Sequence, residues 1–555
     1  MSLAVELQEL LAPAAYPHPV AGLQVVETPI SWVLLTGSLA YKIKRPVRLE
    51  YVDQRTLQRR AQLCAEELRL NRRFAPELYL GVRAIRRDAG RLRVDGDAPG
   101  GGAAFEYAVC MRQFERSQEL DRLVAGAAVS ADELAVFGRE LAALQAGLAP
   151  ALPDAPWGSA DRVRELVLAN LEQCRHAAAA FDTAARVEAL RAPLERVLGR
   201  SAALLGARRA AGRIRECHGD LHARNIVRLD GRLRAFDCVE FEPAFRWIDV
   251  ADDVAFLVAD LETLGVPRLA TAFLQGWLEA SGDWQACRLL PLYQAHRALV
   301  RAKVAALSND ARTSAAQASA AQANAAQANA AQAGESRSLR RAHLAYLAHA
   351  AGVLGPRRPC LLLMSGLSGS GKTWLATRLA PELGALHLRS DIERKRAAGL
   401  APLQVSGSAL GRALYAPEAT AAVYRALRAQ ASDILDGGRS VIVDATFLHA
   451  AERAAWRALA AAQTLPFGVI HCEAPPALLR SRISARRAAG GDASEADLAV
   501  LEWQLERAEP AAPEERSTLI EADTSRADVL DTVLRALRSR YQDVPARSPP
   551  GAENS

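Results

Sequence analysis

The sequence contains very little lysine. Lysine fills five of the 69 basic positions among the 555 residues, and arginine fills the other 64. Arginine supplies surface charge well, but its guanidinium fork does not replace a compact ammonium that points at a single phosphate. The remaining lysines are therefore candidates for specific roles: Lys42, Lys44, Lys303, Lys372 and Lys395. For Lys303 and Lys395, survival by chance is an equally good explanation.

Other absences narrow the class of protein. None of the eight cysteines belongs to a C-x-x-C pair, which argues against a zinc knuckle or a disulfide framework and favours buried thiols. The N-terminal residues lack the pattern of a secretory leader, and no stretch approaches about 18 uninterrupted apolar residues. We therefore expect a cytoplasmic protein with no membrane partner. The net charge of +6, without dense basic runs, gives only weak support to a nucleic-acid partner.

The length predicts two or three domains, because single cores rarely grow beyond about 250–300 residues. The pattern changes near "GPRRP", so we expect one domain over 1–354 and another over 355–541. A five-residue Ala/Gln repeat leaves no constant apolar stripe on a helix, which predicts a solvent-exposed insertion over 312–334 within a helical hairpin. Residues 542–555 read as a disordered tail.

The first domain begins with strand patterns. Residues 23–45 predict two strands joined by the turn "TGS", and further strands follow in "ELYLGVRAIRR", "GRLRVDG" and "FEYAVCMRQF". Between them, a helix is predicted from about Thr56 to Phe74. Its apolar face includes one carboxylate, Glu67, at helical spacing from Leu63 and Leu70.

The stretch "HGDLHARNI" has the chemistry of a phosphoryl-transfer loop. Such transfer requires a carboxylate that orients the acceptor hydroxyl and oxygen ligands that hold Mg²⁺ on the phosphates. Asp220 fits the first role, and Asn225 with Asp237 fits the second. The sequence between Asn225 and Asp237 predicts a hairpin that brings these two residues to one ion.

Nearby polar residues have simpler interpretations. We expect His218 to be a structural hydrogen-bonding residue and His222 to be an orienting or solvated side chain rather than a metal ligand. Asp249 could brace the loop. Asp252 and Asp253 are typical of ordinary carboxylates at a helix start.

These motifs, together with "LAYKIK" and "MRQF", resemble the aminoglycoside phosphotransferase and choline kinase-like family, over roughly residues 20–350. The resemblance implies a bilobal, protein-kinase-like fold of the α+β class. It also implies a role for each matching residue: Lys42 on the α- and β-phosphates, Glu67 paired with it, Met111 to Phe114, including Gln113, as the hinge beside the adenine, Asp220 as base, and Asn225 and Asp237 as metal ligands.

The chain departs from protein kinases in two places. "TGS" around Gly37 replaces a longer glycine-rich loop, and "DCV" stands where protein kinases have D-F-G. Both departures fit small-molecule kinases better. Lys44 lies two residues from Lys42 on the same strand face, so it remains an alternative phosphate lysine.

The second domain carries "GLSGSGKT", which satisfies the phosphate-loop pattern G-x-x-x-x-G-K-[ST] between a predicted strand and a predicted helix. Backbone N–H groups of such a loop cradle phosphate, Lys372 reaches the β- and γ-phosphates, and Thr373 ligates Mg²⁺. The nucleotide-binding candidates are Gly366, Leu367, Ser368, Gly369, Ser370, Gly371, Lys372 and Thr373. Alternating strands and helices after the loop predict a doubly wound parallel α/β sheet.

Two aspartates end strands of this predicted sheet. Asp391 follows one strand, and Asp444 ends another, where it suits contact with Mg²⁺ through water. Arg482 and Arg486 share one helical face and could close over the γ-phosphate, although a solvated face is nearly as good an interpretation. Residues 358–541 resemble P-loop kinases related to polynucleotide kinase and zeta toxins, and this resemblance implies that Asp391 is the base for an acceptor hydroxyl.

The arrangement as a whole resembles bacterial chains described as bifunctional aminoglycoside phosphotransferase/ATP-binding proteins. We expect two sites that use ATP and Mg²⁺ and transfer phosphate to hydroxyl groups of small molecules. The alternative is a regulatory ATP-binding switch, perhaps associated with nucleic acid, in which one domain is catalytically inert. Neither the acceptors nor the oligomeric state follow from the sequence.

The scarcity of lysine generates the first prediction. Lys42→Arg and Lys372→Arg should each impair their own site, because a guanidinium cannot replace the ammonium, whereas Lys303→Arg should be tolerated. Nucleotide affinity and turnover of the three variants test this. Equal tolerance at all three positions would contradict the compositional argument.

Overall fold

The computed structural model describes residues 4–96, 103–319, 325–402, 404, 416–490 and 492–541. The chain forms two compact units: Met1–Glu165 with Ala202–Asp260, and Leu166–Ser201 with Leu261–Ser555. The predicted boundary near residue 355 stays a prediction, and the predicted tail over 542–555 lies outside the described residues. Each unit is described by itself below.

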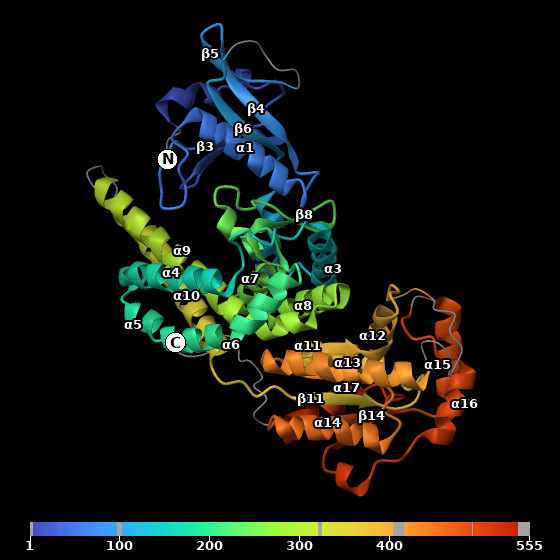
Figure 1. The fold of residues 1–555 in the computed structure, drawn as a ribbon. Coiled ribbons are helices and arrows are strands. Elements are labelled where there is room, and N and C mark those ends of the chain that lie inside the picture. The colour runs from blue at the N-terminus through green and yellow to red at the C-terminus, as the bar shows by residue number, and fades with distance from the viewer. Residues whose placement is uncertain are drawn as a thin grey trace. The chain divides into compact units, whose positions relative to one another are not determined.

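The first unit is built on a six-stranded sheet with the order β1-β2-β3-β6-β4-β5, whose neighbouring strands are antiparallel (Figure 1). The strands are β1 (Gln24–Glu27), β2 (Ser31–Leu35), β3 (Leu39–Lys44), β4 (Tyr79–Asp88), β5 (Arg91–Val94) and β6 (Glu106–Arg112). The prediction of two strands over 23–45 was wrong, because a turn at Thr28 separates β1 from β2. Pro29 in that turn lacks the N–H that a continuous strand would need.

Helix α1 (Leu57–Asn71) contacts β4 and β6 of this sheet. Thr56 caps its start by accepting a hydrogen bond from the Arg59 N–H at 3.2 Å. The predicted apolar face is confirmed: Leu63, Glu67 and Leu70 are buried. The helix therefore carries one carboxylate into the protein interior.

The rest of the first unit contains the predicted hairpin. β8 (Ile226–Leu229) and β9 (Arg232–Ala235) pair antiparallel, and Asn225 directly precedes the hairpin while Asp237 follows it. A second small sheet pairs β7 (Ile214–Glu216) with β10 (Trp247–Asp249). The helical elements are η1 (Val5–Leu11), η2 (Pro13–Ala15), η3 (Arg116–Gln118), α2 (Leu120–Ala125), α3 (Ala131–Gly147), η5 (Ala223–Asn225), η6 (Pro243–Phe245) and most of α7 (Val250–Thr263).

The second unit contains a helical part and a P-loop part. The helical part comprises α4 (Ala160–Ala177), η4 (Ala178–Phe181), α5 (Ala184–Glu188), α6 (Arg191–Ala210), α8 (Pro267–Ser281), η7 (Trp284–Leu289), α9 (Leu290–Ser319) and α10 (Ala325–Leu354), with α4 and α6 shared between the units. α9 and α10 pack as the predicted helical hairpin. The described backbone of the Ala/Gln repeat continues both helices, and the predicted solvent-exposed insertion over 312–334 stays a prediction.

The P-loop part is a five-stranded, all-parallel sheet with the order β12-β13-β11-β14-β15, which confirms the predicted doubly wound α/β fold. Its strands are β11 (Leu361–Ser365), β12 (Leu386–Arg389), β13 (Val441–Asp444), β14 (Phe467–Glu473) and β15 (Leu519–Asp523). The helical elements are α11 (Lys372–Leu383), α12 (Ser390–Ala397), α13 (Pro417–Asp436), α14 (Ala450–Ala462), α15 (Pro476–Ala489), α16 (Leu498–Arg507), η9 (Pro513–Glu515) and α17 (Val529–Arg540). Residues of α11 and α17 form one apolar core with the sheet.

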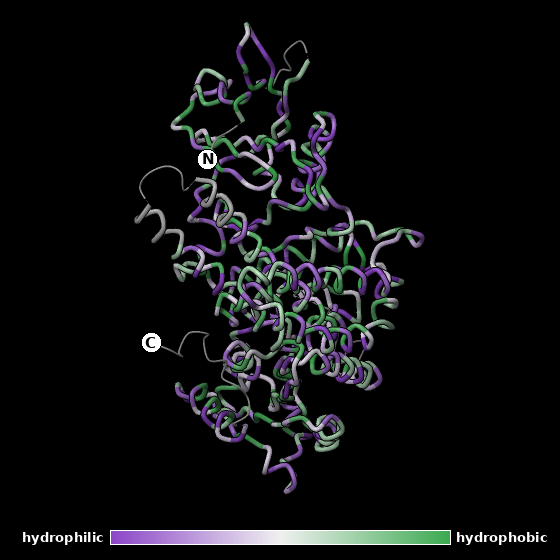
Figure 2. The backbone as a smooth tube through the Cα atoms, turned by 90° about the vertical axis from the view of Figure 1, so that its left-hand side faces the viewer, coloured by the Kyte–Doolittle hydropathy of each residue, from purple (hydrophilic) through white to green (hydrophobic). Residues whose placement is uncertain are grey.

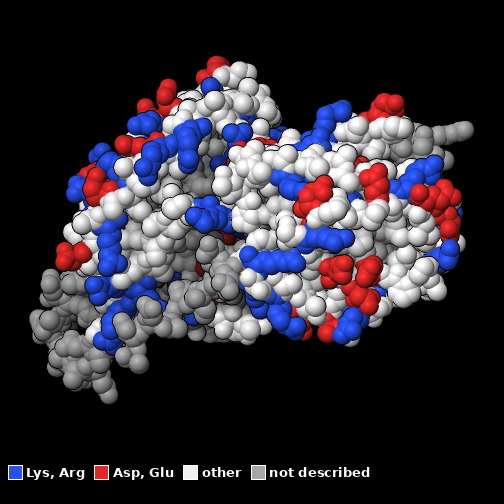
Figure 3. Space-filling model, turned by 90° about the horizontal axis from the view of Figure 1, so that it is seen from below, with Lys and Arg blue, Asp and Glu red and all other residues white. Residues whose placement is uncertain are grey.

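Figures 2 and 3 show how hydropathy and charge are distributed over the described part of the chain. No helix there is long and apolar enough to cross a membrane, and hydrophobic and hydrophilic residues mix along the chain in Figure 2. On the face drawn in Figure 3, the Lys and Arg side chains are scattered among white and acidic ones. That face presents no single basic stripe.

Candidate functional sites in both units

Asp220 and Asn225 of the predicted catalytic loop lie in contact, and their roles stay a prediction. Asn225 Nδ2 donates to Asp220 Oδ2 and to the Asp220 carbonyl, both at 3.0 Å. His222 Nε2 lies 3.3 Å from the same carboxylate oxygen, and this ring is buried. The Asp220 side chain is 35% exposed, so it faces solvent while two neighbours fix its orientation. That arrangement suits a carboxylate that accepts a proton from an incoming hydroxyl.

Two carboxylates of α7 accept hydrogen bonds from the backbone of the catalytic loop. Asp253 accepts hydrogen bonds from the His218 N–H at 2.7 Å and the Gly219 N–H at 2.8 Å, and Asp260 accepts one from the Ala223 N–H at 2.8 Å. The expectation that Asp253 is an ordinary helix-start carboxylate was therefore wrong. Asp249 pairs with the buried Arg208 guanidinium at 2.7 Å, and its suggested bracing role stays a prediction.

His218 has the structural role that the sequence predicted. Its Nε2 lies 2.9 Å from the Phe236 carbonyl, and its ring packs edge-on against Phe74. Burial lowers the pKa of His218 to about 4. The imidazole is therefore neutral at physiological pH, which suits a residue that connects the loop to the segment after β9 that carries Asp237.

Two lysines of β3 share one buried carboxylate. Lys42 Nζ donates to Glu67 Oε1 at 2.9 Å and to Asp237 Oδ1 at 2.5 Å, while Lys44 Nζ contacts Glu67 Oε2 and Glu240. The Lys44 side chain is completely buried, whereas Lys42 faces the predicted metal ligand Asp237. This geometry favours Lys42 over Lys44 as the phosphate lysine, and the assignment stays a prediction.

The charges in this cluster stabilise one another. Burial alone would lower the pKa of Lys42 and raise that of Glu67, because it penalises the charged forms. The Asp237 and Glu67 carboxylates outweigh this effect and raise the pKa of Lys42 well above its ordinary value. Lys42 and Lys44 together lower the pKa of Glu67 to about 2. Lys42, Lys44 and Glu67 therefore stay charged at physiological pH.

The predicted hinge residues hold the turn between β2 and β3. Gln113 Oε1 accepts a hydrogen bond from the Gly37 N–H at 2.9 Å, and the Gln113 N–H donates to the Ser38 carbonyl at 2.9 Å. Gly37 has φ +100°, and a Cβ there would lie 2.9 Å from the Ala21 Cβ, so glycine is required. Met111 is buried next to this segment.

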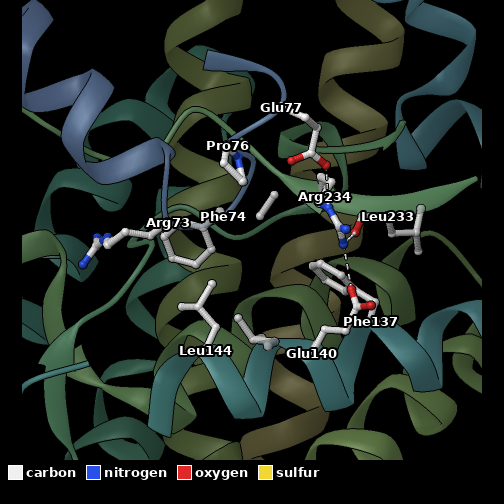
Figure 4. A pocket seen from close by; sticks show the side chains of 11 residues that line it. Arg73, Phe74, Pro76, Glu77, Phe137, Glu140, Leu144, Leu233 and Arg234 are labelled. Atoms are coloured by element: carbon white, nitrogen blue, oxygen red, sulfur yellow. Dashed lines mark hydrogen bonds and ion pairs between the residues drawn. The ribbon is translucent and has the colours of Figure 1, made fainter. Parts of the chain in front are cut away.

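A pocket of about 240 Å³ lies elsewhere in the first unit (Figure 4). None of the predicted site residues lines it. Arg234 spans it by pairing with Glu77 and Glu140, each at 2.7 Å. Phe74, which contacts the His218 ring, forms one wall. The pocket is therefore separated from His218 of the catalytic loop by Phe74, and its walls contain none of the predicted nucleotide-binding residues.

The phosphate loop of the second unit requires its glycines. Gly366 has φ +136°, and a Cβ there would lie 2.3 Å from the Cys472 carbonyl oxygen; at Gly369, with φ +81°, a Cβ would lie 2.8 Å from the Leu479 carbonyl oxygen. The Ser368 N–H donates to Gln504 Oε1 at 2.7 Å, which the sequence gave no reason to expect. The loop is thus packed closely against its neighbours.

The strand register brings three predicted residues to one edge of the parallel sheet. Met364 and Arg389 both align with Asp444, so the phosphate loop, Asp444 and the start of α12, with Asp391, lie at the carboxyl ends of neighbouring strands. Thr373 Oγ1 donates to Asp444 Oδ2 at 2.6 Å. His387 Nε2 lies 3.2 Å from the same oxygen, a contact that sequence reasoning missed.

Lys372 lies within its own loop. Its Nζ donates to the Gly366 and Leu367 carbonyls at 2.8 Å each. Burial lowers the pKa of Lys372, although the charges of Asp444 and Asp391 act in the opposite direction. An anionic phosphate would therefore supply a counter-charge that this ammonium needs.

The two predicted arginines have different contacts. Arg482 donates to the Gly369 carbonyl at 3.3 Å and to Thr524 Oγ1 at 2.9 Å, and Thr524 Oγ1 in turn donates to the Ser370 carbonyl at 2.7 Å. Arg486 donates to the Ala496 carbonyl at 2.8 Å. Arg482 thus braces the phosphate loop, and the binding role predicted for both arginines stays a prediction.

The residues present fit Mg²⁺ in both units. Mg²⁺ prefers oxygen ligands and takes one or two carboxylates together with substrate phosphates and water. The first unit offers the Asp220 carboxylate next to the Asn225 amide, and the Asp237 carboxylate next to Lys42; the second offers the Asp444 carboxylate next to the Thr373 hydroxyl. Among the described residues, no group of three or more His, Cys, Asp or Glu side chains is arranged to hold a metal by itself.

Fold and sites together define a phosphotransferase of the kinase type joined to a P-loop nucleotide-binding segment. The model of the phosphotransferase enzyme family (APH) matches residues 39–290, and the model of an AAA domain (AAA_33) matches residues 361–511. An uncharacterized protein from Mycobacterium tuberculosis strain H37Rv is 31% identical over 515 residues, which cover 90% of this chain and 95% of the relative. A relative from Mycobacterium bovis matches to the same extent. The chain belongs to the family of these two-part proteins.

Solved structures match about a third of the chain. A sugar kinase from Janibacter sp. HTCC2649 is 25% identical over 34% of this chain and 96% of that chain, with a TM-score of 0.26. The APS kinase of Mycobacterium tuberculosis, solved with AMPPNP and APS, is 23% identical over 34% of this chain and 99% of that chain, with a TM-score of 0.24. The assignment of the chain rests on the family models and the relatives of similar length.

The anchoring of the catalytic loop generates the second prediction. Asp253→Asn should destabilise the protein by about 1–3 kcal/mol, because an amide accepts from only one of the two buried N–H groups and opposes the other. Phosphate transfer by the first unit should fall as the loop loosens. Chemical denaturation and transfer assays measure the two effects.

Asp230→Asn is the matched control. Asp230 is an exposed turn residue paired with Arg112, and its loss should change stability by less than about 0.5 kcal/mol. Equal stability and transfer in the two variants would contradict the anchoring role of Asp253.

Proposed function

We propose that the chain is an ATP- and Mg²⁺-dependent phosphotransferase with two nucleotide sites, which transfers phosphate to hydroxyl groups of small molecules. The observation that supports this most strongly is that Lys42, Glu67 and Asp237 form one ionic network in the unit that also orients Asp220. A phosphate-binding cation, a candidate metal ligand and a candidate base therefore occur together. Structural ion pairs alone would not require that combination.

In the first site, Lys42 binds phosphate oxygens while Glu67 holds its ammonium in place. Asp237 and Asn225 hold Mg²⁺, which neutralises charge on the phosphates. The acceptor hydroxyl binds next to Asp220 and gives its proton to that carboxylate as its oxygen forms a bond to the γ-phosphorus. The bond from that phosphorus to the β-phosphate oxygen breaks, and ADP leaves.

In the second site, the backbone N–H groups of the phosphate loop bind the phosphates. Lys372 exchanges its contacts with the Gly366 and Leu367 carbonyls for phosphate oxygens. Thr373 and Asp444 hold Mg²⁺, and Asp391 receives the proton of the second acceptor hydroxyl. Arg482 keeps the loop in shape, and Arg486 approaches the γ-phosphate.

The proposed partners are small-molecule acceptors rather than a membrane. The scattered basic side chains in Figure 3 give no added support to a nucleic-acid partner. A regulatory switch would bind nucleotide without consuming it in an acceptor-dependent way. The oriented Asp220 carboxylate has no evident use in such a switch, so transfer is the function that the geometry supports best.

The third prediction tests transfer directly. The purified chain is incubated with γ-labelled ATP and fractions of a cell extract, and labelled products are identified. Asp220→Asn should retain ATP binding and lose about 10²–10⁴-fold in labelling of the first acceptor, because the proton-accepting carboxylate is gone. Near-normal labelling by this variant would rule out the assigned base, and ATP consumption that is independent of any acceptor would favour the switch.

The fourth prediction concerns the number of sites. Titration of ATP into the unaltered chain should show two sites, because each unit has its own lysine and its own metal ligands. Lys372→Ala should leave one site, and the combined Lys42→Ala and Asp237→Ala changes should leave the other. Coupling of about 1–3 kcal/mol between the sites is compatible with this result. A single site in the unaltered chain, or loss of all binding after either change, would contradict it.

A further inference from the structure

The P-loop sheet has one edge strand that is held by a helix from outside the P-loop part. β12 is the terminal strand of the order β12-β13-β11-β14-β15. Gln275 of α8 donates through Nε2 to the His387 carbonyl at 2.7 Å, and its Oε1 accepts from the His387 N–H at 2.9 Å. The side-chain amide of Gln275 thus satisfies both the N–H and the C=O group of His387 on the edge strand.

The contact between α8, η7 and the P-loop part is close and specific. A Cβ at Gly437 would lie 2.2 Å from the Cys287 carbonyl oxygen, and a Cβ at Gly282 would lie 2.2 Å from Arg396 Nη1. Trp284 is buried and donates through Nε1 to Glu393 of α12 at 3.1 Å. Both sides of this contact belong to the second compact unit.

The residue held by Gln275 reaches the proposed metal site. The His387 backbone is bonded to Gln275, while its side chain lies 3.2 Å from Asp444 Oδ2, the oxygen that also accepts from Thr373. His387 and Asp444 are both buried, so neither has much freedom to find other partners. The path from α8 to the Mg²⁺ ligands therefore has one intermediate residue.

We infer that Gln275 is a positioning residue for the P-loop site: by holding β12 it sets the His387 side chain that orients Asp444 toward Mg²⁺. This inference rests on the proposed function of that site. α8 lies within the segment that the phosphotransferase family model matches, residues 39–290. The P-loop site is thus completed by a helix of the preceding family segment, although its chemical groups all come from the P-loop part.

The test uses the full chain with Lys42→Ala and Asp237→Ala, so that only the second site binds nucleotide. A fluorescent ATP analogue is titrated at a series of Mg²⁺ concentrations. His387→Ala should lower the apparent affinity for Mg²⁺ by about 10–100-fold, the usual effect of losing a residue that orients a metal ligand. Gln275→Ala should lower the apparent affinity for Mg²⁺ by about tenfold. It should leave binding of the ATP analogue without Mg²⁺ unchanged. The double variant should be no worse than His387→Ala, because both residues act along one path.

Arg268→Ala is the matched control. Arg268 lies on the same helix as Gln275 and pairs with Glu382 of α11 rather than with β12. It should leave the Mg²⁺ dependence unchanged. Unchanged Mg²⁺ dependence in Gln275→Ala, equal weakening with and without Mg²⁺, or simple additivity in the double variant would each overturn the inference.

Amide hydrogen exchange separates this inference from the proposed function. The His387 N–H should exchange faster in Gln275→Ala than in Arg268→Ala, because its acceptor is lost. If the parent chain fails to bind nucleotide at the second site, the proposed function of that site fails. The exchange result then still decides whether Gln275 holds β12, and unchanged exchange at His387 overturns the inference.

Discussion

A lysine that binds phosphate from a buried position must have its charge compensated before the phosphate arrives. The two units meet this constraint differently. In the first, the carboxylates of Glu67 and Asp237 surround Lys42, and a second lysine, Lys44, shares Glu67. In the second, the direct partners of Lys372 among the described residues are two loop carbonyls, and burial lowers its pKa. Removing a partner from the first network leaves a buried charge, whereas the second loop has a cation that only a bound anion fully satisfies.

Arginine and lysine have different roles in the two units, although arginine fills most basic positions of the chain. Arginine braces loops throughout the chain: Arg208 holds Asp249 near α7, and Arg482 holds the carbonyl of Gly369. A planar fork suits those roles because it meets several fixed oxygens at once. Lys42 and Lys372 each place one small cation among closely spaced oxygen atoms.

The sequence predicted the parts of the structure that depend on local pattern. The hairpin between Asn225 and Asp237, the buried Glu67 and the strand end at Asp444 all follow from periodicity and turn chemistry, and the structure contains them. It could not predict contacts made across long separations with ordinary residue types. Asp253 resembles any carboxylate at a helix start, yet it accepts from two backbone groups of the catalytic loop. The extra break between β1 and β2 could have been found from Pro29.

The same limit applies to the division of the chain. Composition places a boundary near residue 355, and the family models leave a gap between residues 290 and 361. The described contacts also join α8 and η7 to the P-loop part, where Gln275 supplies partners for the N–H and C=O groups of the edge strand. Helix α8 therefore packs onto the edge of this sheet in the way that a neighbouring strand otherwise would. The lack of side chains at Gly282 and Gly437 allows α8 and η7 to approach the P-loop part this closely.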